Sequence, residues 1–474
     1  MRCFSFFLAF PIHFQESDML EFLPWFAVLV ILCVGWMIIK RYPATIVLFV
    51  AGFTMVAFSM LCGAGGIFPK GVKPTGNALF DIFEIFRSIL SKQTSGVGMV
   101  LMVAGGYAGY MDKIGAARRL ATAVISPLKG ISAPYVVMTV GFLIGSLLFM
   151  VIGSAAGLAM LLLVMLFPIL RAAGVTTPAA AAVIACTAAF PMTPSGGITN
   201  LCAGYSNLDP VVYFVNYQLM ISAPSLLFCC VCQYFTQRYY DRKDAATLVN
   251  NDTTATLEAG RDVPLYYALM PLAPVVIMIV FSPFCIKGVK LNVVTALLLC
   301  WAVCALIEVI RQRSLMSPFK DATQLFKSMG GMFASVVALV VCAEFFATGL
   351  KVTGLIANMI ATAKTAGFGY SGMVGVFTGV VGFVTGLTGS GVAAMTAFAA
   401  IGADVANGLG GSVPGLQHMI HLASCAFRPM SPVAGVVIAV AGAVGMSPFA
   451  LVRRTWFPML ASTLFAFMLT MAIY

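Results

Sequence analysis

Long apolar runs recur along the whole chain and constrain its fold more than any other feature. The mean hydropathy is +1.01 and only 9% of the residues are charged. Because lipid offers no partner for backbone polar groups, only helices and closed barrels cross a membrane, and continuous apolar runs of about 20 residues favour helices. The sequence predicts an all-α polytopic membrane protein with about 10–12 spans. Ten spans are expected at Leu20–Ile39, Thr45–Leu61, Val97–Tyr110, Pro134–Val151, Val211–Phe235, Leu265–Phe281, Val293–Ile310, Phe333–Leu350, Gly372–Leu387 and Thr455–Ile473.

The basic residues indicate topology. The formal net charge is +11, but Lys and Arg gather in short segments between apolar runs, as at Arg118/Arg119 and Arg453/Arg454. An excess of Lys and Arg in short loops is typical of the cytoplasmic side. We therefore expect these loops in the cytoplasm, the lipid bilayer as the surrounding partner, and no binding of nucleic acid. The thirteen cysteines are scattered through apolar runs and are expected to pack in the core.

Composition divides the chain into six segments. We predict an N-terminal extension (1–18), N-terminal spans with an outer loop (19–96), a first repeat (97–240), a polar cytoplasmic linker (241–263), connecting spans (264–326) and a second repeat (327–474). The short apolar patch at the N-terminus is broken by Pro11 and lacks a small-residue cleavage site, so we expect no signal peptide. Met1 and Met19 remain alternative starts.

An internal repeat brings the two halves into register at a shift of about 238 residues. The matching landmarks are Phe190-Pro-Met-Thr-Pro194 with Arg428-Pro-Met-Ser-Pro432, Gly153-Ser154 with Gly389-Ser390, and Asp209-Pro210 with Ser447-Pro448. The basic loops place the start of the first copy outside and the start of the second inside. The copies are therefore predicted to be inverted, which is a common construction of secondary transporters.

Two features interrupt the helices of each copy. A Gly/Ser turn between half-length apolar segments, at Gly153–Gly157 and Thr388–Gly391, predicts a re-entrant hairpin. Downstream, the two prolines of each Pro-Met-Thr/Ser-Pro run remove backbone donors and disfavour helix in the residue before them. We expect discontinuous helices there, with carbonyls available to a cation and helix N-termini available to an anion. The alternative is an ordinary kink of a membrane helix.

Arg428 is the leading candidate for substrate binding. It precedes the second break at membrane depth, where the first copy has Phe190. An intramembrane charge is costly, and a guanidinium holds a carboxylate by two parallel hydrogen bonds. The alternative is an interfacial arginine whose head reaches water.

The other candidates are polar side chains at the hairpin tips, at the breaks and inside apolar runs. For substrate binding we predict Arg428, Ser431, Ser154, Thr193, Ser195, Asn200 and Ser390. For ion coupling we predict Thr199, Thr388, Glu344 and His421. Asn200 can instead satisfy a helix end, Glu344 can pair with a neighbouring helix, and His418 and His421 can be ordinary packed side chains. We expect no cofactor and no metal centre, with Na⁺ or H⁺ as the coupling ion, because the histidines lack companion carboxylates.

Motifs of other functional classes are missing from the sequence. There is no Walker loop, no GxSxG elbow and no HExxH, so neither an enzyme nor a nucleotide-driven pump is supported. The driving force is expected to come from ion gradients or exchange. Two alternatives stay open: a carrier of the same fold for a monocarboxylate, another organic anion or cation/proton antiport, and a channel or non-transporting membrane scaffold.

Several stretches together resemble one family. They are Gly105–Met111 (GGYAGYM), Ile114–Ala116 (IGA), Leu161–Pro168, Thr388–Gly391 (TGSG), Arg428–Pro432 (RPMSP) and Met446–Thr455 (MSPFALVRRT). From about Met19 onward the chain is similar to the DcuC/DcuD family of anaerobic C4-dicarboxylate carriers. The resemblance implies transport of a small organic dianion, namely succinate, fumarate, malate or aspartate, by exchange, uptake or efflux across the bacterial inner membrane. It also supports a carboxylate-binding role for Arg428, and it leaves a homodimer open.

The second hairpin departs from the pattern of that family. The family reads Gly-Ser-Gly-Asn-Ala-Pro where this chain reads Gly389-Ser-Gly-Val-Ala-Ala394. Val392 therefore replaces an amide that can both donate and accept a hydrogen bond. The substrate or the coupling ion is accordingly a point on which this chain is expected to differ.

Overall fold

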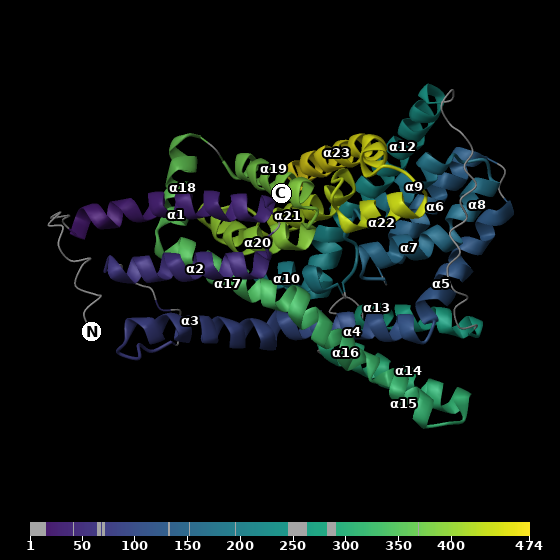
Figure 1. Ribbon diagram of the computed structural model, residues 1–474, viewed down its shortest axis with the longest axis horizontal. Helices are drawn as coiled ribbons and strands as arrows, with labels where there is room; N and C mark the ends of the chain where they lie inside the picture. The colour runs from purple at the N-terminus through teal and green to yellow at the C-terminus, as the bar shows by residue number, and fades with distance from the viewer. Residues whose placement is uncertain are drawn as a thin grey trace. The chain divides into compact units, whose positions relative to one another are not determined.

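The computed structural model is helical wherever it has regular secondary structure among the residues that it describes, which are 16–40, 42–63, 68, 72–130, 133–150, 152–194, 196–244, 263–281, 291–367 and 369–474. The helices are labelled along the chain in Figure 1. They form two compact units, one of Met1–Lys92 and Val341–Gly367 and the other of Gln93–Val340 and Phe368–Tyr474.

The smaller unit is held together by aromatic side chains. Its helices are α1 (Glu16–Ile39), α2 (Ala44–Leu61), α3 (Ala78–Gln93), most of α17 (Ala338–Val352) and α18 (Leu355–Thr365). The ring of Phe345 on α17 lies 5.7 Å from that of Phe49 on α2 and 5.3 Å from that of Phe86 on α3. Gly52 lets α2 approach closely, because a Cβ there would lie 2.9 Å from the carbonyl carbon of Phe345.

The larger unit contains the remaining helices. Its first part consists of η1 (Thr94–Gly98), α4 (Met99–Lys113), α5 (Ala116–Ile125), η2 (Ser126–Gly130), α6 (Pro134–Leu148), α7 (Ala155–Met165), α8 (Phe167–Ala172), α9 (Thr177–Cys186), α10 (Gly197–Tyr205), α11 (Pro210–Tyr213), η3 (Phe214–Leu219) and α12 (Met220–Lys243). After these come η4 (Leu265–Leu272), α13 (Ala273–Val280), α14 (Val293–Gln312), α15 (Met316–Ala322), α16 (Gln324–Met332) and η5 (Phe333–Val337). The last part is α19 (Tyr370–Thr388), α20 (Gly391–Gly408), α21 (Val413–Ala426), η6 (Arg428–Met430), α22 (Gly435–Ala443) and α23 (Pro448–Ile473).

Each of the ten predicted spans coincides with a helix. Among the described residues, seven helical stretches are long and apolar enough to cross a membrane, and five further apolar helices have 10–17 residues. Two differences concern the connections. The predicted outer loop after residue 62 contains α3. Charged residues interrupt the apolar pattern of this helix, so it does not form a uniformly apolar run. α12 continues to Lys243, so the helix enters the segment predicted as a linker, of which residues 245–262 lie outside the described part.

The two repeats are inverted: the helices near their starts pack antiparallel to one another, and so do the helices that end them. α4 of the first copy faces α16 and η5 of the second, and a Cβ on Gly98, Gly105 or Gly109 would lie 2.8 Å or less from Val337, Met332 or Ser328 respectively. As the residue number rises on one helix, it falls on the other. The last helices, α12 and α23, behave in the same way (Figure 1): the hydroxyl of Tyr474 donates to the carbonyl of Asn216, and the amide of Gln237 donates to the carbonyl of Arg454.

Both predicted hairpins and both predicted helix breaks are present. The hairpins are α6–α7 and α19–α20, and the breaks separate α9 from α10 and α21 from α22. α22 packs on α7 and α9, whereas α10 packs on α21. Each repeat therefore places one half of its broken helix against the broken helix of the other repeat, and the two breaks meet inside the larger unit.

Candidate functional site

The first break is shaped by its own side chains. The Nδ2 group of Asn200 on α10 donates to the carbonyls of Pro194 and Gly196, at 3.1 and 2.8 Å. Thr199 Oγ1 accepts a hydrogen bond of 3.1 Å from Gln218 on η3. Because both amide hydrogens of Asn200 bond to carbonyls, the orientation of the amide is determined. Its acceptor atom Oδ1 is buried without a partner among the described residues.

The second break is anchored by α23. The hydroxyl of Thr455 donates to the carbonyl of Pro429 at 2.6 Å. Ser431 is fully buried, and its hydroxyl has no hydrogen-bond partner among the described residues. A buried polar group without a partner is costly. The break therefore contains a buried hydroxyl whose hydrogen-bonding capacity is not used by the described residues.

Arg428 joins the two breaks and the tip of the second hairpin. Its Nη2 atom donates to the carbonyl of Ala188 in the first break at 3.1 Å, which is its one hydrogen bond within the described part of the chain. At the hairpin tip, a Cβ on Gly391 would lie 2.1 Å from the carbonyl oxygen of Ser424 and 3.2 Å from Cδ of Arg428. A Cβ on Gly389 would lie 2.7 Å from Cα of Ala434. The guanidinium thus lies where a hairpin tip and both breaks converge.

The tip hydroxyls cap helices. Ser154 and Ser390 are exposed N-caps of α7 and α20, and their Oγ atoms accept from the backbone amides three residues on, at 3.2 and 3.4 Å. Thr388 Oγ1 donates to the carbonyl of Val384 at 2.8 Å and accepts from the amide of Ser390. Each of the three hydroxyls has a local structural role.

The remaining predicted candidates are dispersed. Thr193 is half-buried in the first break, and Ser195 lies outside the described residues. Glu344, on α17, belongs to the smaller compact unit, whereas Arg428 belongs to the larger one. In the part of the chain that the structure describes, no three side chains of His, Cys, Asp or Glu gather as metal ligands would.

A buried polar cluster, formed by α10, η3, α12 and α21, contains the predicted His421 and its neighbour His418, and it adds Gln218, Ser222 and Gln417, which the sequence analysis missed. The Nε2 atom of His418 lies 3.2 Å from the hydroxyl of Ser222. Gln417 donates from Nε2 to the carbonyl of Ala399. Gln218, Gln417, His418 and His421 each retain one buried polar atom without a partner among the described residues. The sequence feature that could have identified these residues is a single glutamine or serine within an apolar run.

The family model for the C4-dicarboxylate anaerobic carrier matches residues 23–474 of this chain. The chain belongs to the C4-dicarboxylate anaerobic carrier family. Its curated relatives include a probable anaerobic C4-dicarboxylate transporter DcuC of Vibrio cholerae, 32% identical over 94% of this chain and 96% of that protein. DcuC of Escherichia coli K12 is 31% identical over 91% of this chain and 93% of its own length.

Two solved structures share the fold of the carrier. The YdaH transporter of Alcanivorax borkumensis has a TM-score of 0.62 at 15% identity, covering 91% of this chain and 98% of that one. MtrF of Neisseria gonorrhoeae has a TM-score of 0.58 at 14% identity, covering 91% and 94%. The carrier is accordingly a multi-pass protein of the bacterial inner membrane and not an enzyme.

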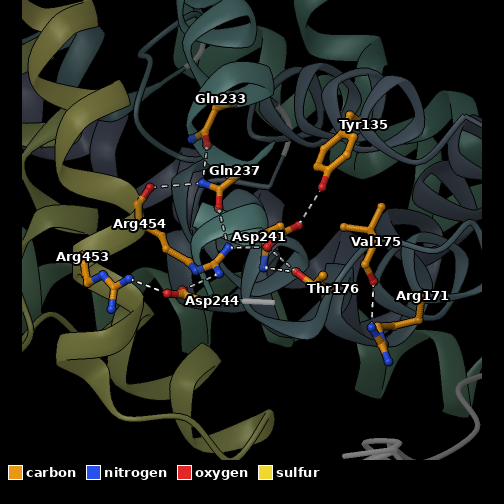
Figure 2. A network of polar contacts seen from close by, with 11 residues as sticks. Tyr135, Arg171, Val175, Thr176, Gln233, Gln237, Asp241, Asp244, Arg453 and Arg454 are labelled. Atoms are coloured by element: carbon orange, nitrogen blue, oxygen red, sulfur yellow. Dashed lines mark hydrogen bonds and ion pairs between the residues drawn. The ribbon is translucent and has the colours of Figure 1, made fainter. Parts of the chain in front are cut away.

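A buried ion-pair network joins the last helices of the two repeats of the carrier (Figure 2). Arg454 on α23 contacts Asp241 and Asp244 at 2.7 and 2.9 Å. The carboxylate of Asp241 also accepts from the hydroxyls of Tyr135 at 3.1 Å and Thr176 at 2.8 Å. Arg454, Asp241 and Asp244 lie in segments that the sequence analysis assigned to cytoplasmic loops. The network therefore fixes α12 to α23, α6 and α9.

Proposed function

We propose that the protein is a secondary active transporter of C4-dicarboxylates that binds one substrate carboxylate at Arg428. The observation that carries this proposal is the position of the guanidinium, which reaches from the second break to the carbonyl of Ala188 in the first. A carboxylate is a better partner for a guanidinium than a carbonyl, because the bond is charge-assisted and bidentate. Substrate would therefore compete with the contact that links the two repeats.

The surroundings of Arg428 suit an anion that also forms neutral hydrogen bonds. Ser431 supplies a buried hydroxyl without a partner in the described structure. Thr193, Ser195 and Asn200 are proposed to contribute from the first break. Coupling to Na⁺ or H⁺ is proposed to use polar groups beside this site, among them Thr199 and His421. Ser154, Ser390 and Thr388 are proposed to act through the shape of the hairpin tips, and Glu344 remains a separate candidate for coupling.

The test is counterflow of labelled succinate in proteoliposomes, comparing Arg428→Ala with Arg87→Ala. Arg428 is half-buried, and loss of a charge-assisted hydrogen bond costs about 2 kcal/mol, so Arg428→Ala should weaken apparent affinity roughly 30-fold. Arg428→Lys keeps the charge but not the bidentate geometry and should recover only part of the loss. Arg87 pairs with Glu84 at the surface, and its removal should leave transport unchanged. Normal succinate counterflow by Arg428→Ala would refute the assignment.

Substrate range is tested by competition. Val392 stands second in α20 beside the tip, where it supplies no side-chain hydrogen bond. Unlabelled succinate, fumarate, malate and aspartate should compete with labelled succinate, and monocarboxylates should not, because one carboxylate alone leaves the second half of the site unused. Stronger competition by a monocarboxylate would favour a carrier of the same fold with a different cargo. Absence of counterflow with retained passive flux would indicate a channel.

A further inference from the structure

Two buried imidazoles on α21 have polar atoms that packing does not explain. His418 is 0% exposed and His421 is 5% exposed. Although His418 Nε2 lies beside Ser222, the Nδ1 atoms of both rings are buried and have no hydrogen-bond partner among the described residues. Apolar side chains such as the neighbouring Met419 and Ile420 fill such positions without that cost. A pair of unsatisfied imidazoles one turn apart is a candidate for a site whose protonation depends on what is bound beside it.

The charges around the pair are unbalanced. His421 interacts electrostatically with His418 and Arg428, and no carboxylate contributes to its surroundings in the described structure. Of the elements packed against α21, α23 carries Arg454, which is paired with Asp241. α20 carries Asp404, two residues after Gly402, and Gly402 faces Leu416 and Ile420 of α21. Tyr370 and Tyr474 lie at Gly415, near the start of α21, and Cys202 faces Gln417. Burial disfavours a charged ring at His421, and among the described residues Arg428 is the one charged group that adds to this effect.

We propose that His421, with His418 beside it, is the proton-binding site of this carrier and takes up one proton when a dianion occupies Arg428. The proposal rests on the function proposed above. In the empty site, the positive charge of Arg428 opposes a second positive charge on His421. A bound dianion reverses the sign of the net charge and favours the imidazolium. The proton enters onto a ring-nitrogen lone pair from one aqueous side and leaves with the substrate on the other, and no other bond is made or broken.

Thermodynamic linkage gives this proposal a measurable form. If dianion binding favours protonation of His421, protonation must favour dianion binding by the same factor. With one coupled proton, the dissociation constant of succinate rises about tenfold per pH unit across the range in which the proton is taken up. If His418 and His421 had a purely structural role, succinate binding would take up no proton, and its dissociation constant would not rise with pH in this way.

The experiment is calorimetric titration of the purified full-length carrier in lipid nanodiscs with succinate at pH 6, 7 and 8. Buffers with different ionisation enthalpies report the number of protons taken up. Wild-type protein should take up about one proton per succinate, and His421→Gln, which retains a polar group without a titrating nitrogen, should take up almost none and bind with little pH dependence. Met419→Leu, one buried substitution on the same helix, is the matched control and should behave as wild type.

The outcomes separate the two proposals. Succinate binding by the wild type without proton uptake at any of the three pH values, or full uptake by His421→Gln, overturns the proton site and leaves the transport function standing. Failure of the wild type to bind succinate refutes the transport function itself. Should His421→Gln not fold, ¹⁵N-histidine spectra in a His13→Gln background report only His418 and His421, because the chain has three histidines. A protonated imidazole signal on adding succinate supports the proposal, and unchanged spectra overturn it.

Discussion

The two adjacent arginines at the start of α23 should differ sharply in what they contribute to stability. The side chain of Arg454 is 3% exposed and pairs with Asp241 and Asp244, whereas that of Arg453 is 50% exposed and pairs with Asp244. Both guanidinium groups also lie over the ring of Tyr240, so this contact does not distinguish them. Removing one partner of a buried ion pair costs about 3–5 kcal/mol, because the remaining charge stays in a dry environment. An exposed pair contributes about 0–1 kcal/mol. We therefore expect Arg454→Met to destabilise strongly and Arg453→Met hardly at all.

The assay is thermal unfolding of purified protein in one detergent at one heating rate, followed by size-exclusion chromatography, since unfolding of such proteins is commonly irreversible. Arg454→Met should lower the apparent melting temperature by on the order of 5 °C and Arg453→Met by about 1 °C or less. Adding Asp241→Leu to Arg454→Met should recover part of the loss, because an apolar pair replaces both buried charges. Recovery should be incomplete, since the hydroxyls of Tyr135 and Thr176 then lack their acceptor. Equal effects of the two single arginine variants would refute the reasoning.

Three further outcomes follow from the contacts. Gly391→Ala should abolish most succinate transport while the protein still reaches the membrane, because its Cβ would overlap a backbone carbonyl; Gly386→Ala, with nothing within 4 Å, should transport normally in the same vesicle assay. Thr455→Val removes the hydrogen bond to Pro429 and should lower stability by about 1 kcal/mol, measured by the same melting assay. Partial burial raises the pKa of Asp244, but hydrogen bonds and charges from two arginines outweigh it and leave that pKa lowered. Its stabilising contribution should therefore persist above about pH 4 and be lost only as the pH falls further, which melting curves at pH 3 to 7 would show.

Spans and breaks were predictable from the sequence because each has a local cause. An apolar run needs no distant partner to form a helix in lipid, and the prolines around Thr193 and Ser431 break helices by their own chemistry. α3 was missed because Glu84 and Arg87 interrupt its apolar pattern at helical spacing. Uniform hydrophobicity finds fully buried helices but not amphipathic ones.

The polar contacts were less predictable because they depend on which helices meet. Asp241 and Arg454 are 213 residues apart, and nothing local indicates that they pair in a buried site. Ser154 and Ser390 remain predicted substrate residues, and their role as helix caps was not foreseen, although a serine before a helix commonly satisfies the backbone amides of that helix. Arg428, the proposed substrate ligand, could be singled out because a charge within an apolar, membrane-spanning sequence is costly.

The contact between Arg428 and Ala188 also has a consequence for biosynthesis. Donor and acceptor are 240 residues apart, so the ribosome completes the acceptor on the order of 10–50 s before the donor. During that interval the carbonyl of Ala188 lacks the hydrogen bond that Arg428 later donates to it. The first half therefore completes its interior only when the second half has been made, and a chain truncated before residue 428 lacks this contact altogether.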